Sequence, residues 1–145
     1  MTGVLPESLV GIREEFLALD QQDRLMLLLE FANDLPELPS HYAEHPDLLE
    51  RVVECQSPVY LFVEVDADNA VHLFATAPPE APTTRGFASI LVQGLEGLSA
   101  EEVLAIPADF PQTLGLNEAV SPLRIRGMSG MLGRTKRQIR ERIAA

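Results

Sequence analysis

Hydrophobic residues in the first third of the chain recur at helical spacing. Apolar side chains lie alternately four and three residues apart, which predicts one face of an amphipathic helix: Leu5, Leu9, Ile12, Phe16 and Leu19. Asp20 suits the N-cap of a second helix that extends to about Leu35, where Pro36 and Pro39 end it. Because the second helix follows directly at Asp20, we expect the two to form an antiparallel pair.

The middle of the chain changes to a strand-like pattern. Residues 59–65 and 71–75 are rich in β-branched and aromatic side chains, and residues 66–69 between them have the composition of a turn. This pattern predicts a β-hairpin. The polar connector before it, residues 40–51, is expected to contain one short helical turn at residues 47–50.

Two histidines in this connector stand four residues apart, a spacing that can place two imidazoles on one metal ion. However, Pro39 and Pro46 flank His41 and His45 and disfavour a regular helix there. No other histidine or cysteine pattern completes a ligand set. We therefore predict no metal site and no cofactor site.

The second half of the chain carries three more helical patterns. Small and apolar residues predict a buried helix over residues 84–97, and Ser99 with Glu102 forms a capping box that opens a short helix through Ile106. An apolar stripe predicts a last helix over residues 127–143, with arginines on its other face. Three evenly spaced glycines are expected to allow close helix packing: Gly127, Gly130 and Gly133.

These elements predict an α+β fold of two layers, in which helices pack on a small antiparallel β-sheet. With 145 residues the chain has the length of one ordinary domain, so we expect residues 1–145 to form a single domain. No apolar run approaches the about 20 residues that a membrane span requires. A single cysteine cannot form an internal disulfide, which favours a reducing, cytoplasmic environment.

Charge is distributed unevenly along the chain. The net charge is -11, but residues 124–145 hold seven basic residues and one acidic residue, whereas residues 1–123 hold 4 basic and 21 acidic residues. An acidic body argues against nucleic acid as a partner, because duplex binding depends on neutralising phosphates. The basic end is expected either to fold back on the acidic body or to meet an acidic partner.

The chemistry that the sequence offers centres on Cys55, the only cysteine. It lies between two β-like runs in the polar stretch Glu54-Cys55-Gln56-Ser57-Pro58. Polar neighbours and Pro58 favour an exposed turn, whereas a single cysteine of unknown context is often a buried, inert residue. A cysteine hydrolase needs a base beside the thiol, and none of the three histidines has such a setting. A cluster scaffold needs several thiolates.

The stretch from Glu54 to Tyr60 resembles the cysteine loop of the SufE family, the sulfur acceptors that work with SufS-type cysteine desulfurases in iron–sulfur cluster assembly. Many members of that family carry glycine at the position of Glu54 and tryptophan at the position of Tyr60. The similarity continues in the family's order along nearly the whole chain, at residues 35–38, 84–88, 114–116, 121–124 and 126–128.

The resemblance implies a fold similar to SufE and the IscU-type scaffold proteins, with Cys55 at a loop tip shielded in a hydrophobic pocket. It implies that Cys55 accepts persulfide sulfur from the desulfurase, stimulates that enzyme and relays sulfur to a SufB-like scaffold. Such a protein is an accessory co-catalyst and not an enzyme in its own right. Residues implied to support the loop or the partner contact are Arg124, Arg85, Gln56 and Ser57.

The oligomeric state expected from these considerations is a monomer or a weak homodimer. A different class of function stays open at this point. In it the chain is a protein interaction module that uses its basic C-terminal helix, and Cys55 is a structural core residue. Substitution of Cys55 separates the two, because the sulfur acceptor would lose its function and the module would keep its binding.

Overall fold

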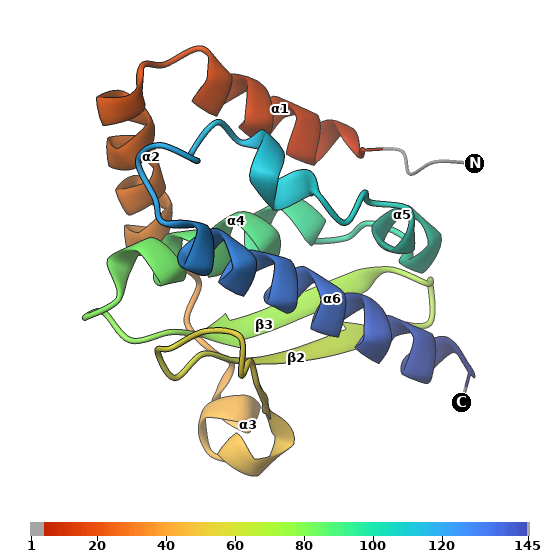
Figure 1. Cartoon of the computed structure of the whole chain (residues 1–145). Coiled ribbons are helices and arrows are strands. Elements are labelled where there is room, and N and C mark those ends of the chain that lie inside the picture. Colours follow the sequence, from red (N-terminus) through yellow and green to blue (C-terminus); the bar gives the residue numbers. More distant parts are fainter. Residues whose placement is uncertain (1–4, 145) are drawn as a thin grey trace.

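A three-stranded antiparallel sheet and the helices that cover it make up the computed structural model, which describes residues 5–144 (Figure 1). The strands, in the sheet order β1-β2-β3, are β1 Glu50–Arg51, β2 Tyr60–Val65 and β3 Val71–Thr76. The α-helices are α1 Glu7–Leu17, α2 Gln21–Asn33, α3 Ser40–Ala43, α4 Pro82–Leu95, α5 Ala100–Leu104 and α6 Pro122–Ala144. Two 3-10 helices, η1 Pro46–Leu48 and η2 Phe110–Thr113, complete the described elements.

The layers follow from the alternation of side chains along the strands. Leu61 and Val63 of β2 and Leu73 of β3 are buried beneath α4 and α6, which lie across one face of the sheet (Figure 1). On the other face, the Tyr42 ring of α3 packs at 5.0 Å from the rings of Phe62 and Phe74. The predicted α+β arrangement of helices on a small antiparallel sheet is therefore confirmed.

The hairpin forms where the sequence predicts it. β2 and β3 pair in register from Tyr60 opposite Thr76 to Val65 opposite Val71. In the turn, the Asp66 carboxylate accepts hydrogen bonds from main-chain N–H groups, and Asn69 adopts a positive φ of 65°. Asparagine tolerates this left-handed conformation better than most residues. The β-like run expected before Cys55 forms only the two-residue strand β1.

The predicted antiparallel pairing of the first two helices is wrong. Asp20 caps α2 as expected, accepting a hydrogen bond from the Asp23 N–H at 2.9 Å, but α2 leaves α1 at a steep angle and packs on α4 (Figure 1). Gly86 permits this contact, since a Cβ atom there would lie 2.5 Å from the Leu28 carbonyl oxygen. Burial of α4 on several sides makes it a better partner for α2 than α1.

The connector before the sheet contains more helix than expected. α3 forms one turn immediately after Pro39, at a position where proline's fixed φ is compatible with a helix start. The second turn, η1, begins at Pro46 and ends before Glu50, which belongs to β1. The helical turn expected at residues 47–50 is thus present one residue earlier, as η1, whereas the turn α3 was not expected.

The last helix begins at Pro122, five residues earlier than predicted. Proline is favoured at the first position of a helix, and the preceding Ser121 hydroxyl accepts a hydrogen bond from the Arg124 N–H at 3.4 Å. The early start places Arg124 and Gly127 in the first turns of α6. Within residues 5–144, no helix is long and apolar enough to cross a membrane.

Candidate functional site

Cys55 lies in the loop that joins β1 to β2. Buried Val52 and Val59 close the loop, with the Val52 N–H donating to the Val59 carbonyl at 2.9 Å. Inside it, the Cys55 N–H donates to the Val52 carbonyl at 3.1 Å. The cysteine is thus in a turn between two strands, as its sequence context predicts.

Although the loop lies at the surface, the Cys55 side chain is turned inward and only 7% of the residue is exposed. It packs on α6 at Gly127, where a Cβ atom would lie 2.9 Å from the Cys55 Sγ atom. Glycine at this position makes room for the thiol. The cysteine is therefore at a loop and buried at once, a combination of the two settings that the sequence left open.

A small polar cavity of about 130 Å³ adjoins the thiol. The cysteine loop forms one wall with Gln56 and Ser57, and the first turn of α6 contributes Arg124. The other lining residues come from the loop itself, from the start of α4 and from α6: Glu54, Cys55, Glu80, Ala81, Pro82, Thr84, Leu123 and Gly127. Gln56, Ser57 and Arg124, which the sequence assigned to this site, thus surround the cavity together.

Arg85, the fourth of these residues, does not lie at the cavity beside Cys55. Its guanidinium donates to the Ala32 carbonyl at 2.9 Å and to the Ala77 carbonyl at 2.7 Å, so it joins the end of α2 to the segment that follows β3.

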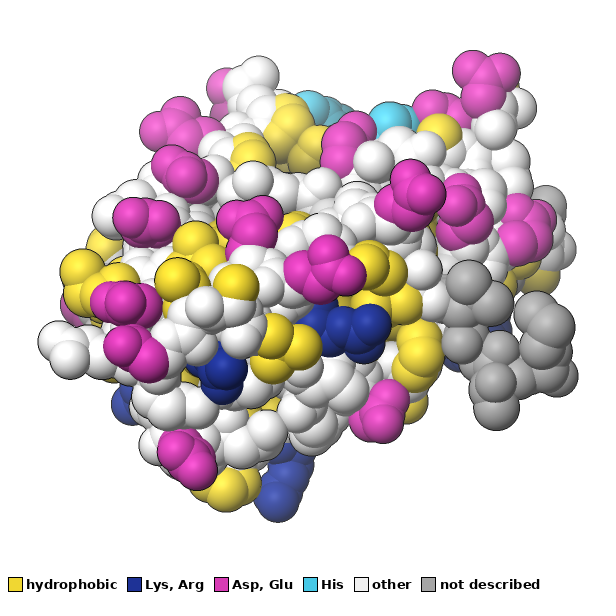
Figure 2. Space-filling view, turned by 90° about the horizontal axis from the view of Figure 1, so that it is seen from above, with side chains coloured by type: hydrophobic (Ala, Val, Ile, Leu, Met, Phe, Trp, Pro, Cys, Tyr) yellow, Lys and Arg dark blue, Asp and Glu magenta, His cyan; other side chains and the backbone are white. Residues whose placement is uncertain are grey.

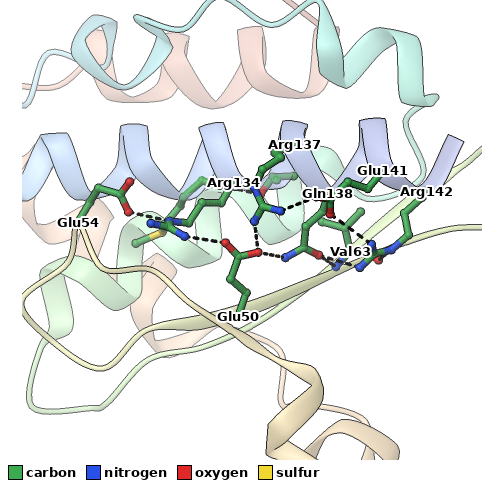
Figure 3. A network of polar contacts seen from close by, with 10 residues as sticks. Glu50, Glu54, Val63, Arg134, Arg137, Gln138, Glu141 and Arg142 are labelled. Atoms are coloured by element: carbon green, nitrogen blue, oxygen red, sulfur yellow. Dashed lines mark hydrogen bonds and ion pairs between the residues drawn. The ribbon is translucent and has the colours of Figure 1, made fainter. Parts of the chain in front are cut away.

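A network of charged side chains holds the cysteine loop against α6 (Figure 3). Arg134 of α6 donates to the Glu54 carboxylate at 2.8 Å and to the Glu50 carboxylate at 2.6 Å. Arg137 also donates to Glu50, and the Gln138 amide does so at 2.7 Å. The two glutamates that flank the loop are therefore tied to successive turns of one helix.

Gly130 allows the Glu54 side chain to lie flat on this helix. A Cβ atom at Gly130 would come within 2.7 Å of the Glu54 Cβ, Cγ and Cδ atoms. Gly127 and Gly130 thus accommodate a loop and not another helix, so the predicted helix-packing role is wrong for both. A Cβ atom at Gly133 would meet nothing within 4 Å.

The comparisons with known proteins agree on one family. The family model described as "SufE: Fe-S metabolism associated domain" matches residues 11–139. The chain belongs to the SufE family. It is 54% identical over 137 residues to a SufE-like protein of Mycobacterium tuberculosis (strain H37Rv), covering 94% of each chain. Membership in the SufE family gives the chain a role in Fe–S metabolism.

Two further relatives extend the comparison. The solution structure of a hypothetical protein from Thermus thermophilus matches with a TM-score of 0.85 at 37% identity, covering 98% of this chain and 100% of that one. The cysteine desulfuration protein SufE of Plasmodium falciparum is 28% identical over 88 residues, which is 59% of this chain and 35% of that protein.

The electrostatic setting of this SufE-family cysteine favours the neutral thiol. Burial raises the pKa of the Cys55 thiol to about 11, the neighbouring Glu54 carboxylate adds to the effect, and Arg134 opposes it. The hydrogen bond from Arg134 in turn lowers the pKa of Glu54. The thiolate is the nucleophilic form, and this setting favours the less nucleophilic thiol at Cys55.

No histidine lines the cavity beside this thiol in the described residues. His41 and His45 lie on the exposed connector with their rings 5.5 Å apart, and no cluster of three possible metal ligands exists within residues 5–144. His72 lies in the hairpin, where hydrogen bonds to Asp66 and Glu96 raise its pKa. The site of this SufE-family protein therefore offers one protected sulfur, an adjoining polar cavity and a nearby guanidinium.

Glu50 and Arg134 are the residues of the site that the sequence did not reveal. Of the two outcomes expected for the basic C-terminal helix, folding back on the acidic body or meeting an acidic partner, Arg134 and Arg137 show the first. Nothing local indicated which carboxylates they would meet, since Arg134 lies 80 residues from Glu54 and 84 residues from Glu50.

Proposed function

We propose that this protein is a sulfur acceptor that takes persulfide sulfur from a SufS-type cysteine desulfurase onto Cys55. It then relays the sulfur to an iron–sulfur scaffold of the SufB type. The observation that carries this proposal is a single cysteine at a loop tip, held against Gly127 beside a polar cavity, in a chain of the SufE family.

The transfer needs one nucleophile and an activated donor. The Cys55 thiolate attacks the terminal sulfur of the donor's persulfide, the bond between the donor's two sulfurs breaks, and the donor leaves as a thiolate that takes up the proton lost by Cys55. Cys55 becomes a persulfide and the donor cysteine is restored. Electrons balance without an added oxidant or reductant. Because the departing donor thiolate takes up the proton, the transfer does not need a resident base.

Transfer requires the loop to leave α6. In the closed loop the thiol is buried and its raised pKa keeps it protonated. Movement outward would break the Arg134–Glu54 ion pair and separate the Sγ atom from Gly127, exposing the thiol and restoring an ordinary pKa. Burial at rest would protect a thiol or persulfide from oxidation, which follows exposure.

The cavity is suited to the persulfide after transfer. Cys55 is one of its lining residues, together with Gln56, Ser57 and Arg124. A cation near a sulfur anion stabilises the charged form, so Arg124 would attract a thiolate or persulfide at Cys55. Arg124 therefore remains our candidate for support of the loop.

The alternative of a docking module with a basic helix is weakened by where the arginines lie. Arg134 and Arg137 pair with Glu50 and Glu54, and Arg142 donates to the Val63 carbonyl at 3.0 Å while stacking at 4.7 Å from the Phe62 ring centre. Much of the basic charge on α6 is thus used inside the molecule and is not presented to a partner.

The proposal is tested by desulfurase turnover. Purified SufS-type desulfurase and free cysteine are mixed with this protein or with its Cys55→Ser variant, and alanine formation is measured. The proposal predicts that the wild-type chain raises turnover and that Cys55→Ser does not. Equal stimulation by the two proteins would contradict it and favour the interaction module.

A further inference from the structure

A second cavity lies along β3, the strand at the edge of the sheet away from β1. It is an apolar groove of about 420 Å³, more than three times the volume of the cavity beside Cys55. One wall is the strand from Leu73 to Ala75, the second is the segment 36–39 that follows α2, and the floor is formed by Val92 and Gln93 of α4. The groove shares no lining residue with the Cys55 cavity, and the proposed sulfur transfer does not use it.

The main chain of β3 leaves hydrogen-bonding groups directed at this groove. The Val71 N–H donates to the Leu98 carbonyl at 2.7 Å, and the Val71 carbonyl accepts from the Gly97 N–H at 2.9 Å, so the groups of Val71 point away from β2. In an antiparallel strand, every second residue points its main-chain groups the same way. The groups of Leu73 and Ala75 therefore also point away from β2.

At both ends of this strand edge, the outward main-chain groups have hydrogen-bond partners. Between the ends they have none. The Ala77 carbonyl accepts a hydrogen bond from Arg85 at 2.7 Å, and Val71 is paired as described. For the N–H and C=O groups of Leu73 and Ala75, residues 5–144 supply no hydrogen-bond partner. Leu73 and Ala75 both line the groove.

At the opposite edge of the sheet, side chains form hydrogen bonds with the outward main-chain groups. Beyond the two-residue β1, the Val63 N–H donates to the Gln138 side chain at 2.9 Å, and the Val63 carbonyl accepts from Arg142 at 3.0 Å. Side chains of α6 thus cap the outer edge of β2 (Figure 3). An uncapped edge is a template for strand pairing, and at β3 that template adjoins an apolar groove.

The charge around the groove defines what can occupy it. Glu37 and Glu96 line it, and no lysine or arginine does. Glu96 is hydrogen-bonded to His72 at 2.6 Å, so Glu37 is the carboxylate of the two that has no partner within residues 5–144. On the face of the molecule seen in Figure 2, acidic side chains are more widespread than basic ones. A second copy of this chain is a poor occupant, because its own Glu37 and Glu96 would approach those of the first, and each copy carries a net charge of -11.

We propose that this groove binds an extended, basic peptide segment of a partner protein by strand addition to β3. The segment's main chain pairs with Leu73 and Ala75, an apolar side chain enters the groove above Val92, and a lysine or arginine meets Glu37 or Glu96. Main-chain pairing supplies affinity in this mode of recognition, and alternate side chains supply specificity. The sulfur-acceptor site and the docking groove are then two separate surfaces of one protein.

The test uses a synthetic probe, the peptide acetyl-Thr-Lys-Val-Lys-Val-Thr-amide, added to the ¹⁵N-labelled full chain. We expect its addition to shift the amide signals of Leu73 and Ala75 in NMR spectra and to slow their exchange with deuterium about fivefold or more. A peptide with glutamate in place of both lysines should bind roughly tenfold more weakly at low salt. The Cys55 amide should be unaffected by either peptide.

Two variants separate the charge effect from loss of folding. Glu37 is exposed and makes no hydrogen bond or ion pair within residues 5–144, so Glu37→Lys should keep the fold and weaken probe binding several-fold at low salt. Glu30→Lys, on the exposed face of α2 outside the groove, is the matched control and should bind the probe nearly as wild type does.

Three results would overturn the proposal. The first is no change at the Leu73 and Ala75 amides at millimolar probe. The second is equal binding of the lysine and glutamate peptides. The third is a shift of these two amides that depends on the concentration of the protein alone, because that result would assign the groove to a second copy of the chain. None of the three bears on sulfur transfer at Cys55.

Discussion

Gly127 is the residue on which the burial of the thiol depends. Any side chain there would bring a Cβ atom to 2.9 Å from the Cys55 Sγ atom, closer than packed atoms lie. We expect Gly127→Ala to push the loop from α6, so that a thiol reagent labels Cys55 several-fold faster, with stability lowered by about 1–2 kcal/mol through overpacking. Labelling kinetics and urea unfolding measure the two effects.

Gly133 provides the matched control on the same helix. Nothing lies within 4 Å of a Cβ atom there, so Gly133→Ala should raise helix stability by about 0.5–1 kcal/mol and leave the labelling rate unchanged. If Gly127→Ala behaved like Gly133→Ala, the thiol would not depend on the space at Gly127.

Because the pKa of the Cys55 thiol is raised in the folded chain, we expect the stability of the fold to depend on pH in the alkaline range. Its pKa in the folded chain is about 11, above the ordinary thiol value of 9.0, so the unfolded chain releases this proton at lower pH than the folded chain does. The contribution of the neutral thiol is fully present below about pH 9 and is lost as the pH rises towards 11. Urea unfolding should show a steeper loss of stability over this window for wild type than for Cys55→Ser. Equal slopes would mean that burial does not perturb the thiol.

At the scale of elements, the contact between the cysteine loop and α6 controls access to Cys55. Arg134→Gln removes the charged hydrogen bonds to Glu54 and Glu50. We expect this substitution to lower stability by about 1–2 kcal/mol and to raise the labelling rate of Cys55 several-fold. Arg126→Gln, at an exposed position of the same helix, should change neither quantity. Similar labelling of the two variants would show that the ion pairs do not hold the loop closed.

What the sequence could predict at this scale depended on distance along the chain. The hairpin, the Asp20 cap and the Ser99–Glu102 capping box are local patterns, and the structure contains all three. The fixation of the loop by Arg134 joins residues 80 and 84 positions apart, and no local pattern encodes it. The start of α6 lies five residues before the predicted position, because Ser121 and Pro122 begin the helix ahead of the first apolar position of its stripe.

At the scale of the whole molecule, folding brings the basic C-terminal helix against the acidic body. Burial by itself raises the pKa of Glu50, because it disfavours the charged carboxylate. Hydrogen bonds from Arg137, Arg134 and Gln138 stabilise the carboxylate more strongly, so the pKa of Glu50 lies below its ordinary value. The pKa of Glu54 is lowered as well. The stabilisation from both carboxylates is therefore present above about pH 4.5 and is lost as the pH falls through their folded pKa values.

Unfolding experiments between pH 7 and pH 3 measure this acid dependence. Wild type should lose more stability over that range than Arg134→Gln, in which part of the network is already absent. The same loss in both proteins would place the acid-sensitive groups elsewhere in the molecule.

The position of Cys55 between two strands was predictable because its neighbours in sequence define the turn. Its burial was not, because the thiol is covered by Gly127, which is 72 positions away in the chain. Arg124 reaches the same cavity for the same reason, since α6 passes over the loop. The turn around Cys55 was thus predictable from local sequence, whereas the burial of the thiol is a property of the assembled fold.

The most direct measurement of the central claim is the intact mass of the protein after incubation with a SufS-type desulfurase and free cysteine. Sulfur transfer to Cys55 predicts a gain of about 32 Da, the mass of one sulfur atom, which is removed by a reducing thiol and absent from Cys55→Ser. An unchanged mass with an active desulfurase, or an equal gain on Cys55→Ser, would contradict the assignment of Cys55 as the sulfur carrier.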